Sequence, residues 1–275
     1  MKGIQRALDE NGNIVFIDNA IQGGETKYFC EICHKELIIK ATNSEKRRKH
    51  FAHKKGTSCT DNWSSHDISE WHLQWQEKFP KEYREVPVGD VNERHRADVN
   101  VLLSVVEFQH SPISYEDFVR RNRFYTEHHY DVIWVFDGDT FINKEWVDDI
   151  TPKWYTRRLH KFKRTQNQFK EFCKDSKVVV YFQMQDKLYK ALEITPRDVC
   201  LVPTDININN FAKKIYESEL NKLDERQKEM ERIKRRVERI KMDEQSKTKR
   251  GKSNVVGVNL YLHLPSTSSC RSPRL

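Results

Sequence analysis

The chain has 275 residues, of which 33% are charged, and a formal net charge of +8 at pH 7. This length allows one large or two small domains with a buried core. No apolar run reaches the roughly 18 residues of a membrane-spanning helix, and residues 1–13 lack the apolar segment of a signal peptide, which excludes a membrane protein and leads us to expect a cytoplasmic one.

The first predicted element is a β-hairpin near the N-terminus. Residues 4–21 contain two short strand-like runs on either side of Glu-Asn-Gly-Asn, and Asn-Gly suits the positive φ angles of a tight turn. A stretch rich in cysteine and histidine follows directly, so we expect the two to form one small N-terminal module.

That stretch has the spacing of a metal site. Cys30 and Cys33 form a Cys-x2-Cys pair, His50 and His53 a His-x2-His pair, and Cys59 comes last. Clustered thiols in a chain without a secretory signal favour a metal over disulfides, and this spacing is typical of structural zinc. If the histidine pair is extended, its two rings point to opposite faces and only one can bind. We expect His53, with His50 as the alternative ligand.

The basic residues within this stretch have two interpretations. Arg47 and Arg48 belong to the cluster EKRRKHFAHKK at residues 45–55, which could bring phosphate contacts to the zinc-held module. Alternatively, zinc only staples a segment that is too small to fold alone, and its basic residues are solvated. The two roles are compatible.

The middle of the chain predicts an α/β core. Residues 66–79 form a predicted helix, since Trp71, Trp75 and Phe79 share one stripe at helical spacing. Strands are then predicted at residues 83–89, 96–102 and 105–111, a helix at 114–129 and a buried strand at 131–139. This order of helix, three strands, helix and strand indicates one α/β domain.

The sequence beyond this core is more charged. We predict a helix at residues 164–176, two strands at 177–184 and 188–194, and one long polar helix at 207–250. Leu223, Met230 and Val237 recur every seven residues in the long helix, as do Ile233 and Ile240. This pattern is equally consistent with a weak coiled coil and with an arm packed on the domain. The tail at 253–275 is expected to be poorly ordered.

Asp98 and Glu107 are the candidate catalytic pair. Side chains alternate along a strand, so pairing of the two strands through a turn near Leu103 and Ser104 puts both carboxylates on one polar face, with Cβ atoms about 5 Å apart. Such a pair suits Mg²⁺, which takes oxygen ligands and can activate water and neutralise charge on a phosphate. The alternative is an ordinary half-exposed hairpin with two solvated acids.

The motifs around this pair occur in a specific order. They are Cys-x2-Cys with His-Phe-Ala-His, Ser69-Glu70-Trp71-His72, Arg96-Ala-Asp98, Glu107-Phe-Gln109, Ser111-Pro-Ile-Ser114 and Arg121-x3-Tyr125. This succession resembles the competence protein CoiA-like family, a branch of the PD-(D/E)XK nucleases. The resemblance covers roughly residues 5 to 138, and the order of the motifs is more specific than any one of them.

The resemblance implies a PD-(D/E)XK restriction-endonuclease-like core of the order α-β-β-β-α-β. In it Asp98 and Glu107 hold Mg²⁺ or Mn²⁺, and Glu70 on the first helix completes or supports the site. Gln109 takes the place of the lysine in the superfamily motif. An amide cannot supply a positive charge but can orient water through neutral hydrogen bonds.

Further polar residues near these motifs have more than one possible role. Arg121 and Tyr125 lie four residues apart on one helix face and could reach DNA phosphate or support the active-site strands, and Tyr125 could equally be core. Arg96, which begins the first strand motif, is the third predicted nucleic-acid contact of this domain. His72 and His110 could touch the phosphate or cap polar edges.

We therefore expect a chain of four parts. These are a β-hairpin and zinc-binding module at 1–62, a PD-(D/E)XK nuclease-like domain at 63–205, a long charged helix at 206–252 and the tail at 253–275. The expected function is Mg²⁺-dependent cleavage of DNA in transformation, recombination or defence against foreign DNA. The alternatives are a non-cleaving DNA-binding recombination accessory protein, and an interaction protein that forms a homo-oligomer or binds a partner through residues 219–250.

Overall fold

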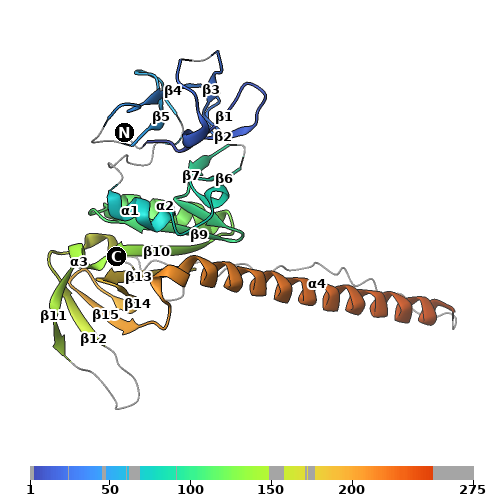
Figure 1. The fold of residues 1–275 in the computed structure, drawn as a ribbon. Helices are drawn as coiled ribbons and strands as arrows, with labels where there is room; N and C mark the ends of the chain where they lie inside the picture. The colour runs from blue at the N-terminus through green and yellow to red at the C-terminus, as the bar shows by residue number, and fades with distance from the viewer. Residues whose placement is uncertain are drawn as a thin grey trace, which may run out of the picture. The chain divides into compact units, whose positions relative to one another are not determined.

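The computed structural model describes residues 3–23, 25–44, 48–59, 61, 69–90, 92–148, 158–170, 172 and 177–249 (Figure 1). The chain is a mixed α/β protein with two main sheets and a long C-terminal helix. It divides into two compact units, Met1–Lys222 and Leu223–Leu275. None of the helices that the structure describes is both long and apolar enough to cross a membrane.

The first unit begins with a five-stranded antiparallel sheet in the order β2-β1-β3-β4-β5. Its strands are β1 (Arg6–Leu8), β2 (Ile14–Phe16), β3 (Tyr28–Phe29), β4 (Glu36–Lys40) and β5 (His50–His53). The predicted hairpin is confirmed, because Ala7 pairs with Val15 across β1 and β2. Gly12 has a φ of 81° in the turn, which a glycine adopts without strain. The carboxylate of Asp9 accepts the backbone N–H groups of Asn11 and Asn13 and closes the loop.

An eight-stranded mixed sheet forms the body of this unit, in the order β11-β12-β15-β14-β13-β10-β9-β8. Its strands are β8 (Val99–Val101), β9 (Ser104–Gln109), β10 (Asp131–Asp137), β11 (Ile142–Asp148), β12 (Arg158–Phe162), β13 (Val178–Met184), β14 (Lys187–Ile194) and β15 (Asp198–Pro203). Strands β9, β10 and β13 run parallel, and all other pairs are antiparallel. A separate two-stranded sheet joins β6 (Pro87–Gly89) to β7 (Arg94–Arg96).

Helices cover both faces of the large sheet. Because side chains alternate along β10, Trp134 lies on one face with the helix α2 (Tyr115–Glu127), and Ile133 lies on the other with α1 (Glu70–Gln76). Each helix begins at a serine: Ser69 accepts the backbone N–H of His72, and Ser114 accepts that of Asp117. A short helix, α3 (Gly138–Phe141), follows β10.

The C-terminal helix α4 (Phe211–Lys249) follows a 3-10 turn, η4 (Ile208–Asn210), so it starts four residues later than the predicted residue 207. Its first turns belong to the first unit, since Phe211 and Ile215 are buried beside Trp75 on the α1 face of the sheet. The predicted tail at 253–275 lies outside the described residues.

Three predicted elements differ in the structure, the first being the strand at 96–102, of which Arg96 belongs to β7 and residues 99–101 form β8 in another sheet. The predicted helix at 164–176 is, among its described residues, a single 3-10 turn, η3 (Asn167–Phe169), because Phe169 turns into the aromatic core beside Phe118 and Phe162. The predicted strand at 83–89 is only β6, which the 3-10 turn η2 (Lys81–Tyr83) precedes. Glu85 has a φ of 53° and breaks the extended backbone between them.

Candidate metal centre and carboxylate pair

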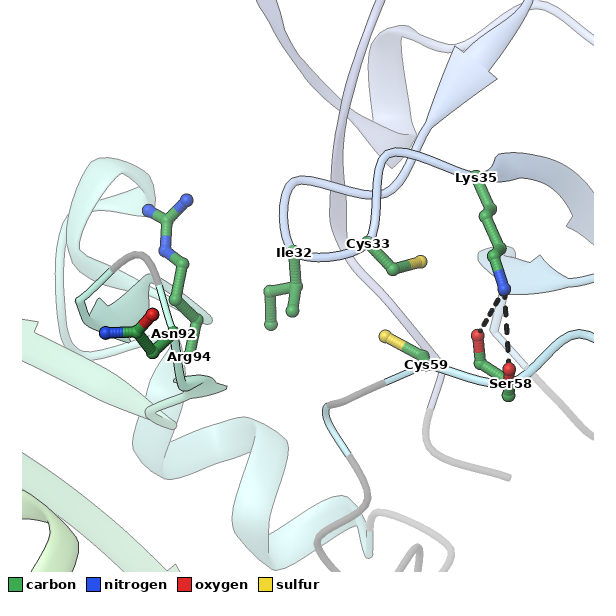
Figure 2. A pocket seen from close by; sticks show the side chains of 7 residues that line it. All are labelled: Ile32, Cys33, Lys35, Ser58, Cys59, Asn92 and Arg94. Atoms are coloured by element: carbon green, nitrogen blue, oxygen red, sulfur yellow. Dashed lines mark hydrogen bonds between the residues drawn. The ribbon is translucent and has the colours of Figure 1, made fainter.

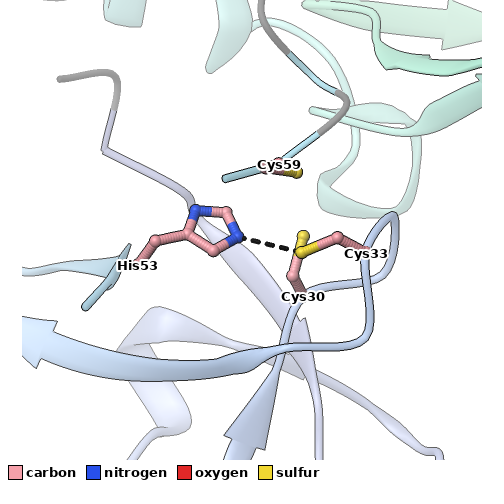
Figure 3. A group of neighbouring side chains, drawn as sticks. All are labelled: Cys30, Cys33, His53 and Cys59. Carbon is pink, nitrogen blue, oxygen red and sulfur yellow. Dashed lines mark hydrogen bonds between the residues drawn. The ribbon is translucent and has the colours of Figure 1, made fainter. Parts of the chain in front are cut away.

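The N-terminal sheet brings four potential metal ligands together (Figure 3). One ligand atom from each of Cys30, Cys33, His53 and Cys59 lies within 4.8 Å of the others. The Cys-x2-Cys segment forms a tight knuckle, in which the backbone N–H of His34 donates to the carbonyl oxygen of Cys30 at 2.9 Å. His34 has a φ of 55°, which the turn requires. The arrangement could bind zinc, because three thiols and one imidazole match a structural tetrahedral site.

The alternation of β5 decides between the two histidines. His53 directs its Nε2 atom to Cys33 Sγ at 3.2 Å, whereas His50 lies with its Nδ1 atom 2.9 Å from the carbonyl oxygen of Arg48. The ring of His50 also packs against Gly3, where an added Cβ would lie only 2.8 Å from it. The structure thus brings His53, and not His50, to the thiols.

The thiols of this cluster share their protons unequally. A hydrogen bond with the Cys59 thiol lowers the pKa of Cys30 to about 4, and the charge of Arg96 acts in the same direction. The same hydrogen bond raises the pKa of Cys59, and burial raises that of Cys33. Thiols this close together share protons, and a bound cation would take the place of those protons.

A pocket of about 420 Å³ opens beside this cluster (Figure 2). Cys33 and Cys59 line it together with Lys35 and Arg94, which supply two positive charges. Lys35 donates its ammonium to the carbonyl oxygen of Ser58 at 3.0 Å. The sequence analysis named neither Lys35 nor Arg94, because these residues are far apart in the chain and only the fold brings them to one pocket.

Arg96, at the end of β7 in the two-stranded sheet, contacts the segment that carries Cys30 and Glu31. It is buried, donates to Glu31 at 3.2 Å and to the carbonyl oxygen of Glu85 at 3.2 Å, and lies 3.8 Å from Cys30 Sγ. Arg6 binds both carboxylate oxygens of Glu31 at 2.9 Å. The structure therefore places Arg96 inside an ion-pair network, so a DNA contact, as predicted, would require these bonds to open.

The β8–β9 hairpin places the two predicted carboxylates next to each other. Its register pairs Val99 with Val106, so Asp98 comes directly before β8 and Glu107 directly follows Val106 on β9. The backbone N–H of Asp98 donates to Glu107 Oε1 at 3.4 Å, and that of Phe108 donates to Asp98 Oδ2 at 2.9 Å. Both carboxylates are buried, with 3% of Asp98 and 1% of Glu107 exposed.

Helix α2 supplies the groups that compensate the charge of Glu107. Arg121 donates to Glu107 Oε2 at 2.8 Å, and the Tyr125 hydroxyl donates to Oε1 at 2.5 Å. Burial acts to lower the pKa of Arg121, but the charges of Glu107 and Asp98 outweigh it and the pKa is raised. Burial, reinforced by Glu107, raises the pKa of Tyr125 well above its usual value. Arg121 therefore stays charged and Tyr125 protonated beside the carboxylate.

Helix α1 contacts Asp98 through residues other than the predicted Glu70. His72 Nε2 lies 3.4 Å from Asp98 Oδ1, and Gln76 donates to the carbonyl oxygen of Asp98 at 3.1 Å. Glu70 is instead a surface residue with 63% of its side chain exposed, in an ion pair with Arg48 at 3.0 Å. The structure does not bring Glu70 to the carboxylate pair. The sequence analysis gave His72 two possible roles, contact with the phosphate or capping of a polar edge, but not contact with Asp98.

The predicted Gln109 lies at the end of β9, where its amide donates to the carbonyl oxygen of Ser111. The next residue, His110, is 2.7 Å from the carboxylate of Asp137 at the end of β10, and its ring packs near Trp71 of α1. Polar side chains thus gather at the carboxyl ends of two parallel strands.

The predicted phosphate contacts of the basic cluster are only partly described. Arg47 lies outside the described residues. Arg48 is half-exposed and pairs with Glu70 and with Glu77, the latter at 2.6 Å. The ion pair with Glu77 is the first cause of the raised pKa of Arg48.

The fold and these two sites define an α/β protein with a Cys3His cluster that could bind zinc and a separate buried carboxylate pair. The family model described as the nuclease-like domain of competence protein CoiA matches residues 89–201, and that described as the CoiA N-terminal domain matches residues 18–62. The chain belongs to the competence protein CoiA family, which confirms the resemblance and points to a nuclease-related role in competence. Neither curated proteins nor solved structures gave a match.

Proposed function

We propose that the chain is a Mg²⁺-dependent DNA nuclease in which Asp98 and Glu107 bind the ion. The observation that carries this proposal is the adjacency of the two carboxylates on the β8–β9 hairpin, inside the segment that matches a nuclease-like domain. Two carboxylates are hard oxygen donors, so the residues present fit Mg²⁺ or Mn²⁺.

The order of elements supports a PD-(D/E)XK-like core. Helix α1, the hairpin β8–β9, helix α2 and the parallel strand β10 follow one another along the chain. Both helices reach the carboxylates, α1 through His72 and α2 through Arg121. The proposed centre therefore lies on the hairpin and is contacted by a helix on each face of the sheet.

The buried carboxylates already have protein cations beside them. A divalent ion at Glu107 would take over charge compensation from Arg121, whose guanidinium would then be available for a DNA phosphate. Bound Mg²⁺ lowers the pKa of a water molecule and neutralises charge on the phosphate. Gln109 would orient the water through its amide, in place of the lysine of the wider superfamily.

The zinc-binding cluster has a structural role in this proposal. Zinc would hold the N-terminal sheet, and Lys35 and Arg94 beside it would contact DNA phosphates. These contacts position DNA but carry no sequence information, so we expect little sequence preference from this surface.

The second candidate is a non-cleaving DNA-binding accessory protein. It is favoured by the hydrogen bonds that already engage both oxygens of Glu107 and by the burial of the pair. In this case Arg121 is the permanent partner of Glu107, and the carboxylates serve stability only.

Cleavage of linear, circular and single-stranded DNA in Mg²⁺, Mn²⁺ or EDTA tests the proposal. Asp98→Asn and Glu107→Gln keep the shape of each side chain and remove its charge. Each should lower the cleavage rate by about 100-fold or more, because a lost ligand weakens metal binding and positioning. Glu116→Gln, at an exposed position at the start of α2, is the matched control and should cleave like the wild type.

The same samples separate the two candidates. A nuclease needs the divalent ion for turnover, whereas a binder loses affinity with increasing salt whether or not Mg²⁺ is present. If the wild type binds DNA without cutting it, and both variants bind with the same affinity, the catalytic assignment is wrong. The chain is then the DNA-binding accessory protein.

A further inference from the structure

The second compact unit contains a helix with a regular apolar face. Within α4, Leu223, Met230 and Val237 recur at one heptad position, and Ile233 and Ile240 at the position three residues later. Each of these five side chains is between 36% and 55% exposed. Large apolar residues at a and d positions are the seam of a coiled coil, which one helix cannot bury alone.

The rest of the helix surface is organised around this seam. Ion pairs four residues apart, Asp224–Lys228 at 2.5 Å and Glu231–Arg235 at 3.4 Å, lie on the outer positions of the heptad. They stabilise the helix without using the seam. The seam positions therefore face solvent along a helix that has its own local support.

We propose that this face binds the same face of a second copy of the chain in an antiparallel coiled coil. One alignment pairs every seam position: Leu223 with Ile240 of the second copy, Met230 with Ile233, and Val237 with Arg226. Two-fold symmetry repeats each pair. Arg226, the one polar seam residue, then lies against a valine, where its apolar stem can pack while its charge reaches solvent.

The flanking charges decide the orientation. In the antiparallel arrangement, Glu229 of each copy flanks Arg236 of the other, which gives two attractive pairs. In a parallel arrangement, Glu229 would flank Lys234, but Arg236 would flank Lys241 and repel it. Two Arg226 side chains would also face each other across the parallel seam. Charge complementarity thus favours antiparallel association.

Sedimentation equilibrium of the full chain over about 1 to 100 μM tests self-association. The wild type should change from monomer to dimer over this range, since a seam of fewer than three heptads binds weakly. Ile233→Asp should remain monomeric because it places a charge in the seam. Met242→Asp is the matched control, because Met242 is 69% exposed but lies off the seam, and it should dimerise like the wild type.

Arg236→Glu tests the orientation without changing the apolar seam. It converts the two attractive pairs of the antiparallel dimer into repulsive ones and should raise the dissociation constant about tenfold. In a parallel dimer the same change would remove a repulsion with Lys241 and tighten binding. Arg239→Glu makes the same charge change away from the seam and should have no effect.

Three outcomes would overturn the proposal. A wild-type monomer at every concentration would mean that the face is covered by residues 250–275 or by another protein, or stays in solvent. A dimer that persists in Ile233→Asp would place the contact elsewhere. Tighter association of Arg236→Glu would contradict the antiparallel orientation, and this surface variant keeps the test valid should Ile233→Asp fail to fold.

Discussion

The proposed chemistry depends most on the surroundings of Glu107. Its carboxylate is almost fully buried, yet it receives hydrogen bonds from Arg121, from Tyr125 and from the backbone of Asp98. Removing one partner of such a buried ion pair leaves an uncompensated charge, which is strongly destabilising. A cation must therefore be present at this position, whether it is Arg121 or a metal ion.

Arg121→Met tests whether a divalent ion can replace the guanidinium. The variant should lose about 3–5 kcal/mol of unfolding free energy without Mg²⁺, because Glu107 is left buried without its cation. Mg²⁺ at millimolar concentration should restore part of this loss by binding the folded state, and should stabilise the variant more than the wild type. Urea unfolding with and without Mg²⁺ measures both effects.

Arg120→Met provides the control for this experiment. Arg120 is the adjacent residue, and it pairs with Asp117 at the surface of α2 at 2.8 Å. Its loss should change stability by less than about 1 kcal/mol, and the response of this variant to Mg²⁺ should match that of the wild type. An Arg121→Met variant that Mg²⁺ does not stabilise would argue against an ion site at Glu107.

The sequence predicted the adjacency of Asp98 and Glu107 from strand alternation and a short turn, and the structure brings the two carboxylates together although Asp98 comes directly before β8. It could not predict which side chains of α1 would face Asp98. The rotation of that helix depends on tertiary contacts, since Trp71 and Trp75 both donate to Gln183 of β13 at 2.8 and 2.7 Å. These contacts bring His72 to Asp98 and leave Glu70 at the surface.

Among the elements, the N-terminal sheet is the one that a zinc ion at the Cys3His cluster would stabilise most. Its strands are two to five residues long, and its apolar cluster is small and includes Cys30. So small a core gives little stability alone, and zinc can supply the missing folding free energy.

Cys59→Ser tests this dependence. The purified wild type should contain one zinc ion per chain by elemental analysis, and the variant should contain much less. Hydrogen exchange should then speed up in β1 to β5 but not in β9, β10 and β13, because only the small sheet depends on the metal. Cys200→Ser, which removes a thiol from β15 outside the cluster, should keep its zinc. Equal zinc content in both variants would refute the proposed ligand set.

Elements with a strong local signal could be predicted from the sequence, and those determined by distant contacts could not. The N-terminal hairpin and α2 carry their own turn and capping residues. Strand β12, with the sequence RLHKF, has too few apolar residues to be predicted as a strand. It pairs with β15, which is distant in the sequence. The turn at Phe169 likewise depends on an aromatic core that no local pattern reveals.

At the scale of the whole molecule, the first unit links the two candidate sites through Arg96. This residue contacts Cys30 of the metal cluster and lies two positions before Asp98. It also forms ion pairs with Glu31 at 3.2 Å and with Asp61 at 3.7 Å. Arg96 therefore has a structural role in the assembly of this unit. The spacing of residues along the sequence could not show this role.

In the proposed nuclease, Asp98 and Glu107 bind a divalent ion. Anomalous diffraction from crystals soaked in Mn²⁺ would locate that ion, with zinc at the Cys30 cluster as an internal reference. We expect a manganese peak between the two carboxylates, with Arg121 displaced from Glu107. A crystal with zinc at the cluster, no manganese at the pair and the Arg121–Glu107 bond intact would contradict the proposal.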